Sequence, residues 1–160
     1  MEACAEGWVE KGDHCYLWSG EKKNWTEAEN FCREEGGHLA SVKTNATMEF
    51  VLEGLVRKNL NWTWIGGSDI DKEGVWKWTD CTPWEAEFWA RGEPNNAGNI
   101  QDCLALVLRS DSYPQLNRQW DDGDCSTKNE FLCSKKICSS DNSEGKIIRN
   151  NWNCSSALQW

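Results

Sequence analysis

Oxygen-bearing side chains are concentrated in one stretch of the chain, GEPNNAGNIQDC over residues 92–103, and in an acidic pair about twenty residues further on. Calcium binds about six to eight oxygen atoms, at roughly 2.3 to 2.6 Å, from carboxylates, amides and carbonyls. The side chains that could supply them here are Glu93, Asn95, Gln101, Asp121 and Asp122. The pattern therefore predicts a calcium site assembled from residues that are distant in the sequence.

The first element expected to support this site is a helix over residues 25–36, WTEAENFCREEG. Thr26 can accept a hydrogen bond from the amide of Glu29, and the Glu29 side chain can reach back, which is a capping box. Apolar residues fall on one face, and glycines follow the last turn. These residues are Ala28, Phe31, Cys32, Gly36 and Gly37.

A second helix is predicted to begin near Thr44 and to end near Arg57 and Lys58, whose charges suit a helix C-terminus. Its apolar face is formed by residues at three-and-four spacing. These are Met48, Val51, Leu52, Leu55 and Val56.

After the helices the chain is predicted to form short strands separated by turns. The strands are expected at residues 62–67, 75–78, 103–108, 118–122 and 130–133. A long loop separates the second from the third, and loops of this length in compact domains are often functional. Among the tryptophans we expect core packing for Trp64, Trp76, Trp78 and Trp120, and we also favour packing for Trp84 and Trp89 in the long loop.

Composition narrows the class of protein. The chain has 160 residues, nine cysteines and a formal net charge of -9. The negative charge disfavours nucleic acid and anionic membranes as partners, and no apolar stretch is long enough to span a bilayer. The cysteines include no C-x2-C pair, which favours disulfides and an oxidising, extracellular location over zinc binding. Sites for N-glycosylation are predicted at Asn24, Asn45, Asn61 and Asn153.

Several motifs, taken together, resemble the C-type lectin domain. They are CYLWSGEKKNWTEAENFCREEGGHLASV, WIGGSD, KEGVWKW, the EPN of GEPNN, QDC, WDDGDC and FLC, spread over residues 4–133. The resemblance implies an α+β double-loop fold, in which two helices flank antiparallel sheets and a long loop carries the EPN motif. It also implies a cis Glu93–Pro94 bond and three disulfides, Cys4–Cys15, Cys32–Cys133 and Cys103–Cys125, which is the long-form pattern.

The resemblance further implies calcium-dependent binding of carbohydrate. In this family two vicinal sugar hydroxyls complete the calcium shell and hydrogen-bond to ligand side chains, here Glu93, Asn95, Gln101 and Asp121. The EPN order resembles the type that selects mannose, N-acetylglucosamine or fucose through equatorial hydroxyls. This chain departs from the usual pattern, because Gln101 stands where glutamate is usual and Asp121 where asparagine is usual. The exchange preserves the summed charge, so we expect the site to be retained.

A second calcium site of the family would map to Asp69, Glu73, Asn96, Gln101 and Asp102. Asn96 and Gln101 are amides where two-calcium members of the family have acids, so the negative charge at this site is reduced.

The prediction is thus a secreted or ectodomain lectin for mannose-type glycans, with no catalytic residues. The domain is expected over residues 1–138 and a polar tail or linker over 139–160. After the three implied disulfides, Cys81 with Cys138 is the preferred further pair, which leaves Cys154 for a disulfide-linked homodimer. The alternative function is that of a calcium-independent receptor domain of the same fold that binds a protein.

Overall fold

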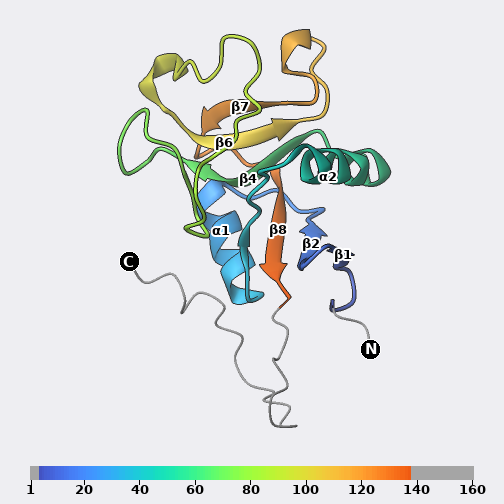
Figure 1. Cartoon of the computed structure of the whole chain (residues 1–160). Helices are drawn as coiled ribbons and strands as arrows, with labels where there is room; N and C mark the ends of the chain where they lie inside the picture. The colour runs from blue at the N-terminus through green and yellow to red at the C-terminus, as the bar shows by residue number, and fades with distance from the viewer. Residues whose placement is uncertain (1–3, 138–160) are drawn as a thin grey trace, which may run out of the picture.

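The computed structural model describes residues 4–137 (Figure 1). Its helices are α1 (Trp25–Glu34) and α2 (Asn45–Lys58), with short 3-10 turns η1 (Ala97–Asn99) and η2 (Pro114–Leu116). Its strands are β1 (Val9–Lys11), β2 (His14–Trp18), β3 (His38–Leu39), β4 (Trp62–Ser68), β5 (Lys77–Trp78), β6 (Gln101–Val107), β7 (Gln119–Asp124) and β8 (Glu130–Lys136). Within residues 4–137, neither helix has the length and apolar content needed to cross a membrane.

Helix α1 begins at Trp25, as predicted, but its capping residue is not the one expected. Asn24, and not Thr26, is the N-cap: its side chain accepts from the Glu27 amide at 2.9 Å, and the Glu27 carboxylate accepts from the Asn24 amide at 3.3 Å. The predicted box of Thr26 and Glu29 was therefore wrong. Glu29 is buried and accepts hydrogen bonds from β3, so its side chain ties the helix to the sheet.

Helix α2 begins as predicted, because the Thr44 side chain accepts from the Thr47 amide at 3.1 Å. Its buried residues include Met48, Val51, Leu52 and Leu55. Val56 was wrongly placed on this face and is 59% exposed. The helix buries Gly54, where a side chain would collide with the indole of Trp18, and Val56, two residues further on, lies on nearly the opposite face.

The strands form one network in the order β1-β2-β8-β4-β6-β7, with β3 paired to β8 and β5 paired to β4. All of these pairings are antiparallel except that of β4 with β8. In Figure 1, α1 and α2 lie on either side of β8, while β6, β7 and the long loops form the opposite end of the molecule. The predicted α+β fold of two helices and antiparallel sheets is confirmed.

The strand predictions were accurate for most of the chain after α2 and incomplete before it. Strands β4, β6, β7 and β8 lie within a few residues of their predicted bounds. The strand expected over 75–78 is shorter, since β5 comprises only Lys77–Trp78. Val75 lies outside it and is 41% exposed. Strands β1, β2 and β3 were not predicted, since β2 has no regular alternation of buried and exposed residues.

Three disulfides hold the framework, and all three pairings implied by the resemblance are confirmed: Cys4–Cys15, Cys32–Cys133 and Cys103–Cys125. Among the described residues Cys81 is a free, exposed cysteine. Cys138 and Cys154 lie outside the described residues, and so do the predicted pair with Cys81, the predicted intermolecular link and the boundary between domain and tail.

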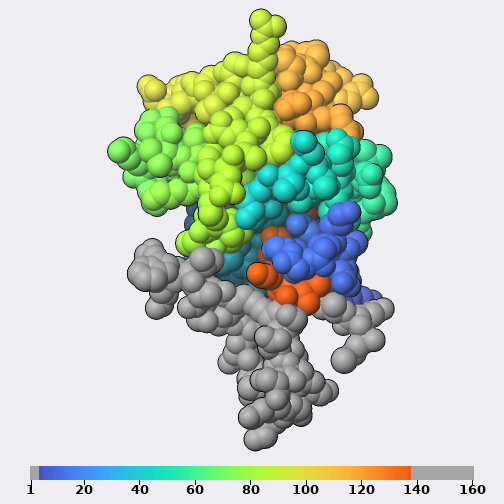
Figure 2. Space-filling model, in the orientation of Figure 1, coloured from blue at the N-terminus to red at the C-terminus, as the bar shows by residue number. Residues whose placement is uncertain are grey.

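Five tryptophans pack together in an aromatic cluster: Trp76, Trp78, Trp84, Trp89 and Trp120. Trp120 is fully buried, and Trp78 and Trp84 lie 4.6 Å apart between ring centroids. Trp84 and Trp89 pack against this core, as predicted. The core positions of Trp64, Trp76 and Trp78 are likewise confirmed. The loop between β5 and β6 is therefore anchored by its aromatic residues, and in Figure 2 it forms a continuous ridge along this face.

Candidate functional site

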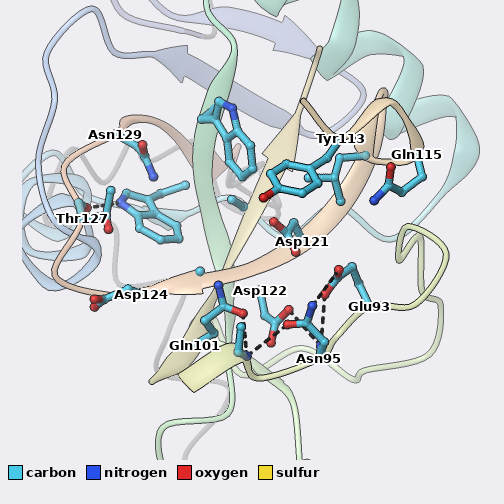
Figure 3. Close-up of a pocket in the computed structure, with 16 residues that line it drawn as sticks. Glu93, Asn95, Gln101, Tyr113, Gln115, Asp121, Asp122, Asp124, Thr127 and Asn129 are labelled. Carbon is cyan, nitrogen blue, oxygen red and sulfur yellow. Dashed lines mark hydrogen bonds between the residues drawn. The ribbon is translucent and has the colours of Figure 1, made fainter. Parts of the chain in front are cut away.

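A pocket of about 440 Å³ opens beside β7 (Figure 3). All the residues predicted as ligands of the main calcium site line it: Glu93, Asn95, Gln101, Asp121 and Asp122. They come from the loop before η1, from the first residue of β6 and from the middle of β7. The fold thus brings the two sequence segments together at one place.

Three carboxylates form the acidic part of this pocket. Glu93, Asp121 and Asp122 each offer an oxygen atom, and these oxygens all lie within 4.8 Å of one another. Asp122 is fully buried, and its two oxygens accept from the backbone amides of Asn95 and Asn96 at 3.1 and 2.6 Å. The Asp122 side chain therefore fixes the backbone of the EPN loop against β7.

The amide side chains are held in the same hydrogen-bond network. Asn95 donates from its side chain to Glu93 at 3.0 Å, across the cis Glu93–Pro94 bond. The side-chain oxygens of Asn95 and Gln101 both accept from the Ala97 amide, at 3.1 and 2.9 Å. Each amide therefore has its oxygen oriented by the loop backbone.

Strand pairing sets the relative positions of the two halves of the site. In the register of β6 and β7, Leu104 pairs with Asp122 and Ala105 with Asp121. The Cys103–Cys125 disulfide joins β6 to the residue that follows β7, at the end where Gln101 begins β6. The site is therefore built on a short, cross-linked hairpin and does not depend on the loop alone.

Crowding of the carboxylates changes their acidity. Burial, together with the neighbouring Asp121 and Asp122, raises the pKa of Glu93 to about 8. Burial and repulsion from Asp122 raise the pKa of Asp121 to about 6. Because opposite charge nearby would remove this repulsion, the group is suited to a cation. The donors are oxygen atoms, and no His or Cys lines the described pocket, so the set fits calcium better than zinc.

A second acidic cluster is formed by Asp69, Glu73 and Asp102, whose carboxylate oxygens also lie within 4.8 Å of one another. Asp69 is 3% exposed; one of its oxygens accepts from the Gly74 amide, and the other has no hydrogen-bond partner among the described residues. Burial raises the pKa of Asp69. The acids of the predicted second site are thus brought together.

The amides predicted for that second site are used elsewhere. The Asn96 side-chain oxygen accepts from the Gln101 amide at 3.0 Å, and the Gln101 side chain lines the main pocket. The participation of these two amides in a second site stays a prediction.

The sequence reasoning missed part of the pocket. Its far side is lined by Trp62, Tyr113, Gln115 and Leu116, of which Tyr113 is 58% exposed. An exposed aromatic residue in the polar segment SDSYPQLN, between two predicted strands, was the available signal. Figure 3 shows Asp121 lying between Tyr113 and the loop that carries Asn95.

The fold and the site define a disulfide-bonded domain that carries an acidic, oxygen-lined pocket on its long loops. The family profile described as Lectin C-type domain matches residues 21–135. The chain belongs to the C-type lectin domain family.

Curated relatives share much of the chain. C-type lectin lectoxin-Lio1 of Erythrolamprus poecilogyrus is 37% identical over 134 residues, covering 81% of this chain and 78% of the relative. A C-type lectin mannose-binding isoform of Oxyuranus scutellatus is 36% identical over 136 residues, covering 81% and 82%. The galactose-specific lectin nattectin of Thalassophryne nattereri is 29% identical over 138 residues, covering 84% and 82%.

Solved structures with the same fold include one determined with an oligosaccharide and one of a calcium-independent protein. The carbohydrate-recognition domain of cow CD23, solved in the presence of a GlcNAc2Man3 oligosaccharide, has a TM-score of 0.74 and 27% identity, covering 85% of this chain and 98% of that one. A calcium-independent type II antifreeze protein also has a TM-score of 0.74 and 27% identity, covering 84% and 95%. Membership of this family therefore does not by itself identify the ligand.

Proposed function

We propose that this protein is a calcium-dependent lectin that binds mannose-type glycans through vicinal equatorial hydroxyls. The observation that supports this most is the convergence of the Glu93, Asp121 and Asp122 carboxylates within 4.8 Å, in a pocket that two amide side chains also line. The calcium ligands would be Glu93, Asn95, Gln101, Asp121 and Asp122. The cluster of Asp69, Glu73 and Asp102 would hold a second cation.

Calcium, when bound, would supply a Lewis-acidic centre that hydroxyl oxygen atoms of a sugar could coordinate. The protein side chains would then set which sugar fits. Carboxylates only accept hydrogen bonds, whereas amides also donate them. Glu93 and Asp121 would each accept from a sugar hydroxyl, while Asn95 and Gln101 would donate to one, so each hydroxyl meets one acceptor and one donor.

Retention on immobilised mannose tests the proposal directly. We expect the protein to bind mannose-agarose in millimolar calcium, to elute with EDTA or free methyl α-mannoside, and to pass through galactose-agarose. Binding to mannose that persists unchanged in EDTA would contradict calcium dependence. Absence of binding to any sugar resin would favour the calcium-independent, protein-binding alternative. Retention on galactose alone would overturn the specificity that the EPN order implies.

Calcium affinity is expected to fall with decreasing pH, by roughly tenfold per pH unit where one proton must be displaced. The pKa values of about 8 for Glu93 and about 6 for Asp121 place the onset of this loss near pH 8 and make it steeper below pH 6, so that it begins above the ordinary carboxylate range. Because both values are raised, protonation stabilises the metal-free fold at low pH, and this stabilisation is lost as pH rises through them. Calcium offsets that loss.

Thermal melting measures the effect. The increase in melting temperature between EDTA and saturating calcium should be larger at pH 8 than at pH 5. An increase that is constant over this range, or larger at pH 5, would show that these carboxylates do not bind the ion.

The three disulfides support the proposal of an extracellular location, since such bonds persist in oxidising compartments. Two of the proposed glycosylation sites, Asn45 and Asn61, are exposed, and Asn24 caps α1 through its side-chain oxygen. Asn153 lies outside the described residues.

A further inference from the structure

We propose that the pocket binds at least two sugar residues, and that Tyr113 and Gln115 form an outer subsite for the second, uncharged one. This inference rests on the proposed function, because it extends the same site beyond the sugar held by calcium. The outer subsite consists of four residues that line the pocket: Trp62, Tyr113, Gln115 and Leu116.

The pocket is continuous between the two subsites. The proposed calcium ligands and the residues of the outer subsite line one and the same pocket of about 440 Å³, which Asp124, Thr127 and Asn129 also line. Figure 3 shows the Tyr113 hydroxyl turned toward Asp121, with Gln115 on the same side. A sugar held at Asp121 would therefore have the outer subsite as its immediate neighbour, and a glycosidic extension from it could enter without crossing a barrier.

The chemistry of the outer subsite suits a neutral sugar ring. Tyrosine offers an apolar ring and a polar hydroxyl, and a hexose has an apolar C–H face edged by hydroxyls. The Gln115 amide can both donate and accept hydrogen bonds. The side chains of the outer subsite carry no charge, in contrast to the acidic cluster beside them. Tyr113 is 58% exposed, which leaves its surface available for contact.

The loop that carries Tyr113 is held in place before any ligand binds. The Ser110 amide donates to the Asn117 side chain at 2.6 Å, and the Tyr113 amide donates to the Ser110 hydroxyl at 3.1 Å. The Leu116 amide donates to the Tyr113 carbonyl at 2.9 Å. Ordering a loop on binding costs free energy, so a loop that is already ordered binds more tightly.

The loop that carries Tyr113 is packed against the start of the loop that carries the EPN motif. Leu116 is buried in a small cluster with Ala90 and Val107. Ala90 accepts a hydrogen bond from the Glu93 amide at 2.9 Å, directly before the EPN motif. The outer subsite and the proposed calcium site therefore share one apolar anchor, which fixes the distance between them.

Calorimetry with mono- and disaccharides tests the inference. The probes are methyl α-mannoside, the α1,2-, α1,3- and α1,6-linked mannobioses and N,N′-diacetylchitobiose, each titrated in saturating calcium. We expect at least one disaccharide to bind roughly tenfold tighter than methyl α-mannoside, the size of effect that a well-placed aromatic contact gives. Tyr113→Ala should reduce this ratio to about one, whereas Tyr113→Phe should keep most of it because the ring remains.

Ser112→Ala provides the matched control, since Ser112 lies in the same loop but does not line the pocket, and it should leave the ratio unchanged. The inference is overturned if no disaccharide binds more tightly than methyl α-mannoside, or if Tyr113→Ala leaves the ratio intact. In both cases the calcium-dependent lectin stands. If methyl α-mannoside and the disaccharides all fail to bind in calcium, the proposed function fails and the outer subsite fails with it.

Discussion

Asp122→Asn is expected to lower calcium affinity by at least about 100-fold and to destabilise the metal-free domain. Asp122 is fully buried, and both of its oxygens accept backbone amides of the EPN loop. Asparagine removes one charge from the cation site and turns an N–H donor toward an N–H donor. An unsatisfied buried polar group costs about 1 to 3 kcal/mol, which corresponds to a decrease in melting temperature of roughly 3 to 10 °C for a domain of this size.

Isothermal titration with calcium and thermal melting in EDTA measure the two effects. Asp124→Asn is the matched control. Asp124 lies on the same strand as Asp122 and lines the same pocket, and its substitution changes the net charge equally. The Asp124 carboxylate accepts from Ser126 and is outside the acidic cluster, so we expect calcium affinity to change by less than about threefold. Equal losses in both variants would show that net charge, and not the site, attracts the ion.

The second large effect is expected at the exchanged pair of ligands. Asp121→Asn removes one of three converging carboxylates and should weaken calcium binding by roughly 10- to 100-fold. Adding Gln101→Glu should restore affinity to within about fivefold of the original. The Ala97 amide donates to the Gln101 side-chain oxygen at 2.9 Å, and the carboxylate introduced by Gln101→Glu can still accept this hydrogen bond.

Calcium titration of both single variants and the double variant separates charge from position. Gln101→Glu alone should bind calcium more tightly than the unmodified chain, since it adds a fourth carboxylate. If the double variant binds no better than Asp121→Asn alone, the two positions do not compensate. The effect on sugar binding follows from the same samples on mannose-agarose, where the double variant should regain retention.

The helices were largely predictable because capping residues and the spacing of apolar residues are local sequence signals. Thr44 and the regular spacing of Met48, Val51, Leu52 and Leu55 define α2 without reference to any other element. The first residue of α1 was predicted correctly, but its N-cap was not, because Asn24 and Thr26 are both acceptable caps and the contact of Glu29 with β3 decides between them. Local patterns cannot report such a tertiary contact.

The site was predictable in part for a similar reason. Glu93, Asn95, Gln101, Asp121 and Asp122 belong to motifs, and the structure places all of them on one pocket. Tyr113 and Gln115 belong to no motif, and their approach to Asp121 depends on how the segment between β6 and β7 folds back. Leu116 of that segment packs with Ala90 and Val107, and Ala90 belongs to a different loop, so local sequence patterns do not reveal the contact.

The pairing of β1 with β2, and of β2 with β8, has a consequence for how the molecule can be displayed. Strands from the beginning and the end of the described chain lie together, at the pole opposite the long loops (Figure 1). Any tether joined at either end therefore leaves from the same pole. A cell surface, a bead or a second domain attached there would leave the opposite pole open to approaching glycans.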